Sequence, residues 1–283
     1  MELIPPNTNY DFLGNRRYAY IFTAVVLTIS LLGIPIKGGL KLGIDFKGGA
    51  MIQARFNKPV DTEQVRKALS SFGEISVQKF AMSGEEFLIR MDVSDESTGL
   101  LGNQVKELLD KSVGQGSTEI RSVEMVGPKV GKDLRESAIW ATVIALIFLL
   151  VYMAFRFTFT MGLGAIVCLI HDLIVVYGLF VWTGKEFDLT ILAAMLTIIG
   201  YDVNDTIVVC DRIRDNLKIM KKQPLIEVMN AAINQTLSRT VLTSSFTLLV
   251  VISLLVFGTR VLQDFAWALL VGILFGTYSS IFV

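Results

Sequence analysis

The stretch LTILAAMLTIIGYDVNDTIVVC, residues 189–210, decides the fold class of this sequence. As a helix it is long enough to cross the roughly 30 Å hydrocarbon core of a bilayer, which takes about 20 apolar residues. It nevertheless carries two aspartates, Asp202 and Asp205, three positions apart and hence on one helical face. A carboxylate at membrane depth is costly unless it faces a bundle interior, a water-filled path or a partner. The stretch therefore predicts a membrane helix that packs among others.

Five more apolar runs of spanning length occur in the chain, at Tyr18–Ile36, Ser137–Phe155, Phe157–Thr183, Thr240–Thr259 and Phe265–Val283. Four of these runs carry no charged residue, and Phe157–Thr183 is interrupted only by the pair His171-Asp172. Hydrophobic residues make up 52% of the sequence and charged residues 18%, and the mean hydropathy of +0.57 is too high for an ordinary soluble domain. We predict an α-helical integral membrane protein with six transmembrane helices, for which the lipid bilayer is the solvent.

Basic residues at the ends of the runs predict the orientation, because short cytoplasmic loops carry an excess of Lys and Arg. One side of the membrane holds Arg16, Arg17, Arg156, Arg212, Arg214, Lys218, Lys221, Lys222 and Arg239, whereas the short loops of the other side hold Lys185 and Arg260. Both termini are therefore expected in the cytoplasm, and residues 37–136 outside it, in a bacterial inner (plasma) membrane. We interpret the first apolar run, Tyr18–Ile36, as a signal anchor that is retained in the membrane rather than cleaved. Since the sequence stops inside its last apolar run, we expect a missing cytoplasmic tail.

Residues 37–136 have the pattern of a small soluble domain. Alternating apolar residues predict strands over Gly49–Phe56, Ile75–Ala81, Glu86–Val93 and Thr118–Val126. Helical stripes of apolar residues separate them, at Val65, Ala68, Leu69 and Phe72 after an N-cap at Asp61 with Gln64, and at Leu101, Val105, Leu108 and Leu109. The order βαββαβ is that of a ferredoxin-like α+β domain. We therefore divide the chain into residues 1–36 (cytoplasmic N-terminus and first transmembrane helix), 37–136 (extracytoplasmic α+β domain) and 137–283 (transmembrane helices 2 to 6).

Two further patterns concern helix packing. Leu225, Met229, Ile233 and Leu237 recur every four residues after Pro224, which predicts either an interfacial amphipathic helix or an ordinary packed connector. In the last apolar run, small residues recur every four positions at Gly272, Gly276 and Ser280, a spacing that permits close helix approach.

The candidate functional residues are the ionisable side chains inside the apolar runs. They are Asp172, its neighbour His171, Asp202 and Asp205, together with Arg239, the nearest basic residue on the following run. Burial disfavours an ionised carboxyl group and a nearby arginine favours it. A buried aspartate whose arginine partner comes and goes can therefore exchange protons, which suits a proton-coupled transporter. Arg239 can alternatively snorkel to the interface, and His171 can be hydrogen-bonded inside the bundle.

Sites of other kinds have little support in the sequence. With one histidine, no CxxC pair and no Walker-type run, it predicts no metal site, no cofactor and no catalytic residue. An intramembrane aspartyl protease would need a second G-x-G-D motif, but Asp172 follows Leu169-Ile170-His171. A net charge of zero argues against a nucleic-acid partner. The chain is accordingly not expected to be an enzyme.

Several motifs resemble those of the bacterial protein-export membrane protein SecF family, over nearly the whole chain. They are GIDFKGG (43–49), VGPKVG (126–131), HD (171–172), GYDVNDTIVVCDRIRDN (200–216) and QTLSRT (235–240). The resemblance implies structural roles for Asp45, Phe46, Gly48, Gly49, Gly127, Pro128, Gly200 and Asn204. SecF belongs to the resistance-nodulation-division superfamily, whose members place an outside domain between the first two of six helices in each half.

The resemblance also implies partners and a function. These are a SecD-like subunit that supplies the other half, the SecYEG channel, unfolded preprotein substrates and a role in export driven by the proton gradient. It implicates Asp205 and Arg239 in proton coupling. At the position of Asp202 the family usually has a small polar residue such as serine, so this chain carries an extra carboxylate, and either aspartate can be the one that titrates. Sodium is an alternative coupling ion, and alternative functions are a small-molecule or lipid exporter of the same superfamily and a scaffold of the export channel without motor activity.

Overall fold

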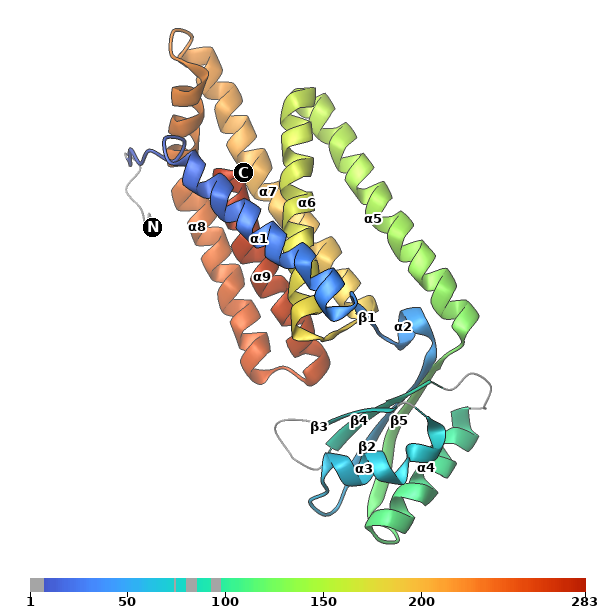
Figure 1. The fold of residues 1–283 in the computed structure, drawn as a ribbon. Helices are drawn as coiled ribbons and strands as arrows, with labels where there is room; N and C mark the ends of the chain where they lie inside the picture. The colour runs from blue at the N-terminus through green and yellow to red at the C-terminus, as the bar shows by residue number, and fades with distance from the viewer. Residues whose placement is uncertain (1–7, 74, 80–85, 93–97) are drawn as a thin grey trace. The chain divides into compact units, whose positions relative to one another are not determined.

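The computed structural model describes residues 8–73, 75–79, 86–92 and 98–283, and the chain divides into two compact units. The first unit consists of Met1–Lys41 and Trp140–Val283, and the second consists of Leu42–Ile139. The first unit is a helical bundle, and the second is a small sheet covered by helices (Figure 1).

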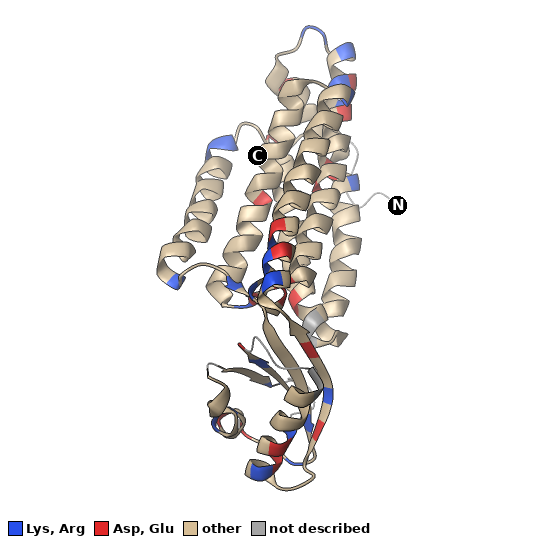
Figure 2. Ribbon diagram, turned by 90° about the vertical axis from the view of Figure 1, so that its right-hand side faces the viewer, with Lys and Arg blue, Asp and Glu red and all other residues tan. Residues whose placement is uncertain are grey.

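Six helices in the described part of the chain are long and apolar enough to cross a membrane, as the sequence predicted. They are α1 (Arg16–Lys37), α5 (Pro128–Arg156), α6 (Phe159–Thr183), α7 (Leu189–Ile219), α8 (Leu225–Phe257) and α9 (Arg260–Phe282). Lysine and arginine lie mostly at the ends of these helices, which leaves their middles largely uncharged (Figure 2). Local capping sets several of the ends: the Asp188 side chain accepts a hydrogen bond from the backbone N–H of Ile191 at 2.9 Å, and Gly184 ends α6 in the left-handed conformation.

Helices α7 and α8 both extend beyond the predicted apolar runs. The apolar stripe that follows Pro224 is the beginning of α8 rather than a separate helix, and Leu225 at its start is exposed. Its Ala232 and Ile233 are buried against Val209 and Ile213 of α7. The later part of the stripe therefore packs against protein, as the alternative of a packed connector predicts.

Polar contacts hold the extended end of α7. Asp211 accepts from Arg156 at 3.0 Å and from Arg214 at 2.9 Å, and the amide of Asn216 donates to Gln235 of α8 at 2.9 Å. These side chains need an aqueous or headgroup environment, which explains why the hydropathy signal ends before the helix does.

Small residues bring the helices of the bundle close together. A Cβ atom at Gly272 of α9 would overlap with the Ile198 side chain of α7, and one at Gly178 of α6 would overlap with Ser30 of α1. The close packing predicted from the spacing of Gly272 and Gly276 is thus confirmed. Helix α5 joins the bundle through its second half, where Met153 is buried against Ala165 and Cys210.

The second unit has the predicted ferredoxin-like topology. Its strands are β2 (Gly49–Phe56), β3 (Ile75–Lys79), β4 (Glu86–Met91) and β5 (Thr118–Val126), all antiparallel in the order β3-β4-β2-β5. The helices α3 (Thr62–Ala68) and α4 (Thr98–Val113) connect them, and the remaining short elements are β1 (Lys41–Leu42), α2 (Ile44–Lys47), η1 (Ser70–Phe72) and β6 (Glu186–Phe187). The predicted strand ends at 80–81 and at 93 lie outside the described residues.

Alternation along the strands builds the core of this unit. Ile52, Ala54 and Phe56 of β2 are fully buried, and the ring of Phe56 meets that of Phe87 edge to face at 5.2 Å. The buried residues of the two helices close the core from one side of the sheet, at Val65, Leu69, Leu101, Val105 and Leu109. Asp61 and Gln64 form the predicted capping box at the start of α3.

The two glycines of the DFKGG segment are required by backbone conformation. Gly48 and Gly49 have φ values of +87° and +122°, a region that side-chain-bearing residues rarely adopt. A Cβ atom at Gly49 would lie 2.7 Å from the carbonyl oxygen of Met91 on β4, and one at Gly48 would lie 2.9 Å from Cα of Pro128. By contrast, Gly127 has open space around its position.

Replacing Gly49 should therefore weaken the sheet. We expect Gly49→Ala to destabilise the second unit by about 1–3 kcal/mol, because alanine must adopt a strained backbone conformation and displace β4. The measurement is hydrogen exchange of the β2 and β4 amides in the full chain, which should be faster in the variant than in the unchanged protein. The matched control is Gly127→Ala, which should exchange like the unchanged protein. Equal exchange rates for the two variants would show that the positive φ of Gly49 carries no constraint.

Candidate functional site

Three helices bring the predicted carboxylates into the interior of the bundle. Asp172 on α6 is fully buried, and Asp202 and Asp205 on α7 are each only 3% exposed. Helix α9 covers them from the third side, since it packs against both α6 and α7. The structure therefore brings together residues that lie far apart in the sequence.

Asp172 is held by two hydrogen-bonding partners. Its Oδ1 lies 2.8 Å from Nδ1 of His171, and its Oδ2 accepts from the Ser279 hydroxyl of α9 at 2.7 Å. An ionised carboxylate only accepts hydrogen bonds, so the proton of a neutral His171 must then be on Nδ1. The ring of His171 lies beside those of Phe275 and Tyr278, with each centroid 6.3 Å away. His171 thus orients Asp172 from within the bundle.

Asp202 faces the same interior without a donor. Neither of its carboxyl oxygens has a hydrogen-bond partner among the described residues. Its side chain lies against Gly276 of α9, where any Cβ atom would overlap with it. The carboxyl groups of Asp202 and Asp172 interact with each other, and Asp205 also acts on Asp202. The small residue at 276 therefore makes room for a carboxylate in an otherwise tightly packed interface.

Asp205 and Arg239 interact through their charges without forming a close ion pair. The positive charge of Arg239 on α8 acts on Asp205. Within the described ranges, however, the structure has no ion pair of 4.0 Å or less between them, and the Asp205 Oδ2 is buried without a partner. Arg239 is exposed on the outside of this chain. Asp205 and Arg239, the pair predicted from the sequence, therefore interact through their charges but are not in direct contact.

The exposed face of α7 beside this pair consists of small and polar residues. Thr197, Gly200 and Asn204 are exposed and follow one another at helical spacing. Gly200 and Asn204 therefore do not line the buried cluster. The other motif positions, Asp45, Phe46, Gly48, Gly49, Gly127 and Pro128, belong to the second unit.

Hydroxyl groups near the cluster were not predicted. Ser279 contacts Asp172, although the four-residue spacing had singled out its neighbour Ser280. Tyr201 donates to Ser244 at 3.2 Å, and Ser244 lies 2.7 Å from the Thr277 hydroxyl. Serine and threonine occur throughout apolar runs without a periodic signal, so only the helix packing identifies those that face the carboxylates. Among the described residues, no three His, Cys, Asp or Glu side chains form a group suited to a metal ion.

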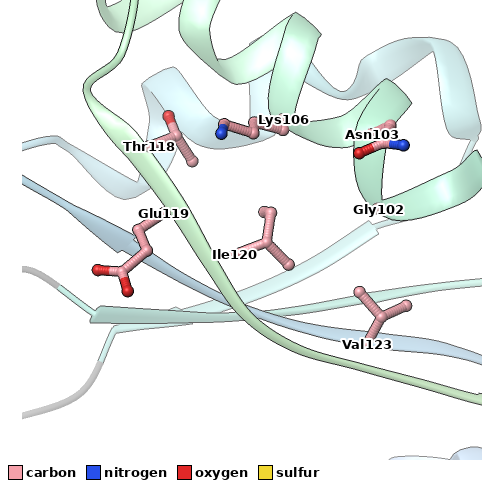
Figure 3. A pocket seen from close by; sticks show the side chains of 7 residues that line it. All are labelled: Gly102, Asn103, Lys106, Thr118, Glu119, Ile120 and Val123. Atoms are coloured by element: carbon pink, nitrogen blue, oxygen red, sulfur yellow. The ribbon is translucent and has the colours of Figure 1, made fainter. Parts of the chain in front are cut away.

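The second unit carries an open groove of about 550 Å³ between α4 and β5 (Figure 3). Lys106 of α4 and Glu119 of β5 supply its charges, and Ile120 and Val123 supply apolar surface. Strand β5 lies at the edge of the described sheet, next to β2 alone. The groove therefore runs beside a strand that has one side available for pairing.

Family matches cover most of the chain. Residues 104–283 match the family described as "Protein export membrane protein SecD/SecF, C-terminal", and residues 34–60 match the "SecD/SecF GG Motif". The second match contains the two glycines whose positive φ values the fold requires.

Full-length relatives and solved structures agree with this assignment. The chain is 42% identical to the protein translocase subunit SecF of Calditerrivibrio nitroreducens, across 99% of this chain and 93% of that one. It is 41% identical to SecF of Vibrio alginolyticus, across 100% and 90%. The crystal structure of SecDF from Thermus thermophilus, described as a translocon-associated membrane protein, superposes with a TM-score of 0.84 at 38% identity. That match covers 99% of this chain but only 38% of the longer SecDF chain. Sequence and fold together establish that this chain belongs to the SecF family of protein translocase subunits.

Proposed function

We propose that this chain is a proton-motive-force-driven accessory subunit of the Sec translocase. It works with a SecD-like membrane subunit and the SecYEG channel in the export of unfolded preproteins. The observation that carries the coupling is the open pair of a buried Asp205 and an exposed Arg239 on adjacent spanning helices. Both termini lie in the cytoplasm, and residues 37–136 form the extracytoplasmic domain.

Approach and withdrawal of Arg239 would control the proton on Asp205. When the guanidinium is close, its charge favours the ionised carboxylate, and when it withdraws, burial favours the protonated acid. A cycle that moves α8 against α7 therefore takes up a proton in one state and releases it in the other. Such a cycle converts the proton gradient into helix movement, which the extracytoplasmic domain can transmit to a substrate.

A second membrane subunit is needed to complete this site. Arg239 and Asn204 are exposed at the level of the bundle, where lipid would solvate neither side chain. Small residues such as Gly200 allow another helix to approach α7 closely. The solved SecDF chain is much longer than the part that matches here, so a SecD-like half is the natural occupant of this face.

The extracytoplasmic domain offers a binding surface for an extended polypeptide. An incoming strand can pair with the free side of β5, while its side chains enter the groove lined by Lys106 and Ile120. Backbone pairing does not depend on sequence, which suits a substrate that arrives unfolded and varies from one preprotein to the next.

The partner proposal predicts that the purified chain brings down a larger membrane subunit. The exposed Arg239 and Asn204 should make the single chain unstable, because the bilayer cannot satisfy them. Co-purification in mild detergent, followed by size-exclusion chromatography, measures this. A functional, monodisperse six-helix monomer would contradict the proposal.

The groove should contact preprotein during export. A photoreactive residue in place of Lys106 is expected to crosslink to the preprotein, whereas the same residue at Lys67, an exposed lysine on α3, should not. Crosslinks are read as a mobility shift of labelled preprotein in export-competent vesicles. Equal crosslinking from both positions would show that the preprotein contacts the domain without using the groove.

The coupling proposal predicts that Asp205→Asn abolishes the gradient-dependent part of export. Asparagine keeps the size of the side chain but cannot carry the proton, so expression and partner binding should persist. Arg239→Lys should retain part of the activity, because it keeps the charge. Export into inverted vesicles, with and without an uncoupler, measures the gradient-dependent part.

The matched control for this prediction is Asp215→Asn on the same helix. Asp215 is half-exposed and paired with Lys218, so its replacement should leave export unchanged. Full gradient-dependent export by Asp205→Asn would refute the assignment of the proton carrier. If the unchanged chain stimulates export equally well in the presence of an uncoupler, the result would instead favour a scaffold without motor activity.

A further inference from the structure

We infer that Asp172 and Asp202 hold one proton between them, which makes a second protonation position one helical turn from Asp205. The shared proton follows from the geometry of these two residues. Its use in transport rests on the proposed function.

The first observation is that Asp202 lacks every other donor. Its carboxyl group is buried, and neither oxygen has a partner among the described residues. Leaving a buried ionised carboxylate unpaired costs several kcal/mol, since burial penalises the charged form. The residue can avoid this cost by carrying a proton.

The second observation is the position of Asp172. The carboxyl group of Asp172 accepts from Ser279 of α9, and that of Asp202 lies against Gly276, one helical turn away on the same helix. Both carboxyl groups are therefore buried against the same short stretch of α9, where the natural contact between them is a hydrogen bond. Two ionised carboxylates cannot form that bond, because both only accept. One proton makes the bond possible and removes the repulsion between two like charges at close range.

The partners of Asp172 determine where the proton lies. Asp172 already accepts from His171 and from Ser279, two bonds that favour its ionised form. Asp202 has no such donors, so it carries the proton and donates to Asp172. The result is a hydrogen-bonded chain from His171 through Asp172 to Asp202, and Gly276 provides the space that it needs.

The surroundings contain few other groups that can exchange this proton. The groups that act on the pair directly are Cys168 and His171 on α6 and Asp205 on α7. Behind these groups, Cys210 on α7 acts on Cys168, Arg239 on α8 acts on Asp205, and the ring of Tyr278 on α9 lies 6.3 Å from that of His171. Between Ile21 and Ile36, α1 has no ionisable side chain, and within Ser137–Phe155 α5 has only Tyr152. Asp205 is the nearest carboxylate on the same helical face, which makes it the natural exchange partner.

Infrared spectroscopy tests the shared proton without any transport. The probe is the C=O stretching band of a protonated carboxyl group at neutral pH, recorded for the full chain with its co-purifying subunit in lipid nanodiscs. Asp205→Asn serves as the background, so that a proton on Asp205 cannot contribute. In this background we expect a band that moves in heavy water, disappears with Asp202→Asn and with Asp202→Ser, and shifts in frequency with Asp172→Asn.

Asp202→Asn also controls for folding, because its amide N–H can donate to Asp172 in place of the acid. Its melting temperature should therefore match that of the background. A carboxyl band that survives both substitutions of Asp202 would overturn the inference. So would a band that vanishes when sodium chloride replaces potassium chloride, since the pair would then bind a cation rather than a proton.

Export measurements separate the two proposals. Asp202→Asn in the otherwise unchanged chain is expected to lose part of the gradient-dependent export, and full export would remove the pair from the proton path. If Asp205→Asn exports normally while its infrared band still depends on Asp202, the proposed carrier fails and the shared proton stands.

Discussion

The cost of an unpaired charge inside a membrane bundle is the constraint on which the rest of this structure depends. Three aspartates, Asp172, Asp202 and Asp205, are buried within the helices of the first unit. Water cannot stabilise them there, so every one needs a hydrogen bond, a counter-charge or a proton. The packing of α6 against α9 satisfies this need for Asp172 through Ser279, and the small residue Gly276 leaves room for the side chain of Asp202.

The same constraint divides the site into an inner and an outer part. Asp172 is fixed by His171 and Ser279 inside this chain, so it is built into the fold. Asp205, by contrast, interacts with an Arg239 that lies on the exposed face. An inner aspartate held by hydrogen bonds and an outer aspartate whose charged partner is not in contact suit the proton-driven movement that we propose. In the proposed cycle, the side chains of the inner part keep their positions while those of the outer part change partners.

Much of the fold was predictable because it depends on periodicity. The strands Gly49–Phe56 and Thr118–Val126 begin and end at the predicted residues, since alternation of apolar and polar positions is a local property. The ends of α7 and α8 were not predictable from hydropathy, which falls where Asp211 and Gln235 enter polar contacts although the helix continues. In the site, Asp172, Asp202 and Asp205 were recognisable as charges in apolar runs. Ser279 was not, because its role depends on which face of α9 meets α6.

Asp202 illustrates how an extra charge can be accommodated in a tightly packed interface. The resemblance to the family leads one to expect a small polar residue such as serine at this position, whose hydroxyl could donate to Asp172 directly. An ionised aspartate in its place would bring repulsion instead of a hydrogen bond. A protonated aspartate restores the donor and adds a proton that can leave. The substitution therefore preserves the bonding pattern around Asp172 only while the proton is present, which links the packing of α6, α7 and α9 to the protonation state of a single side chain.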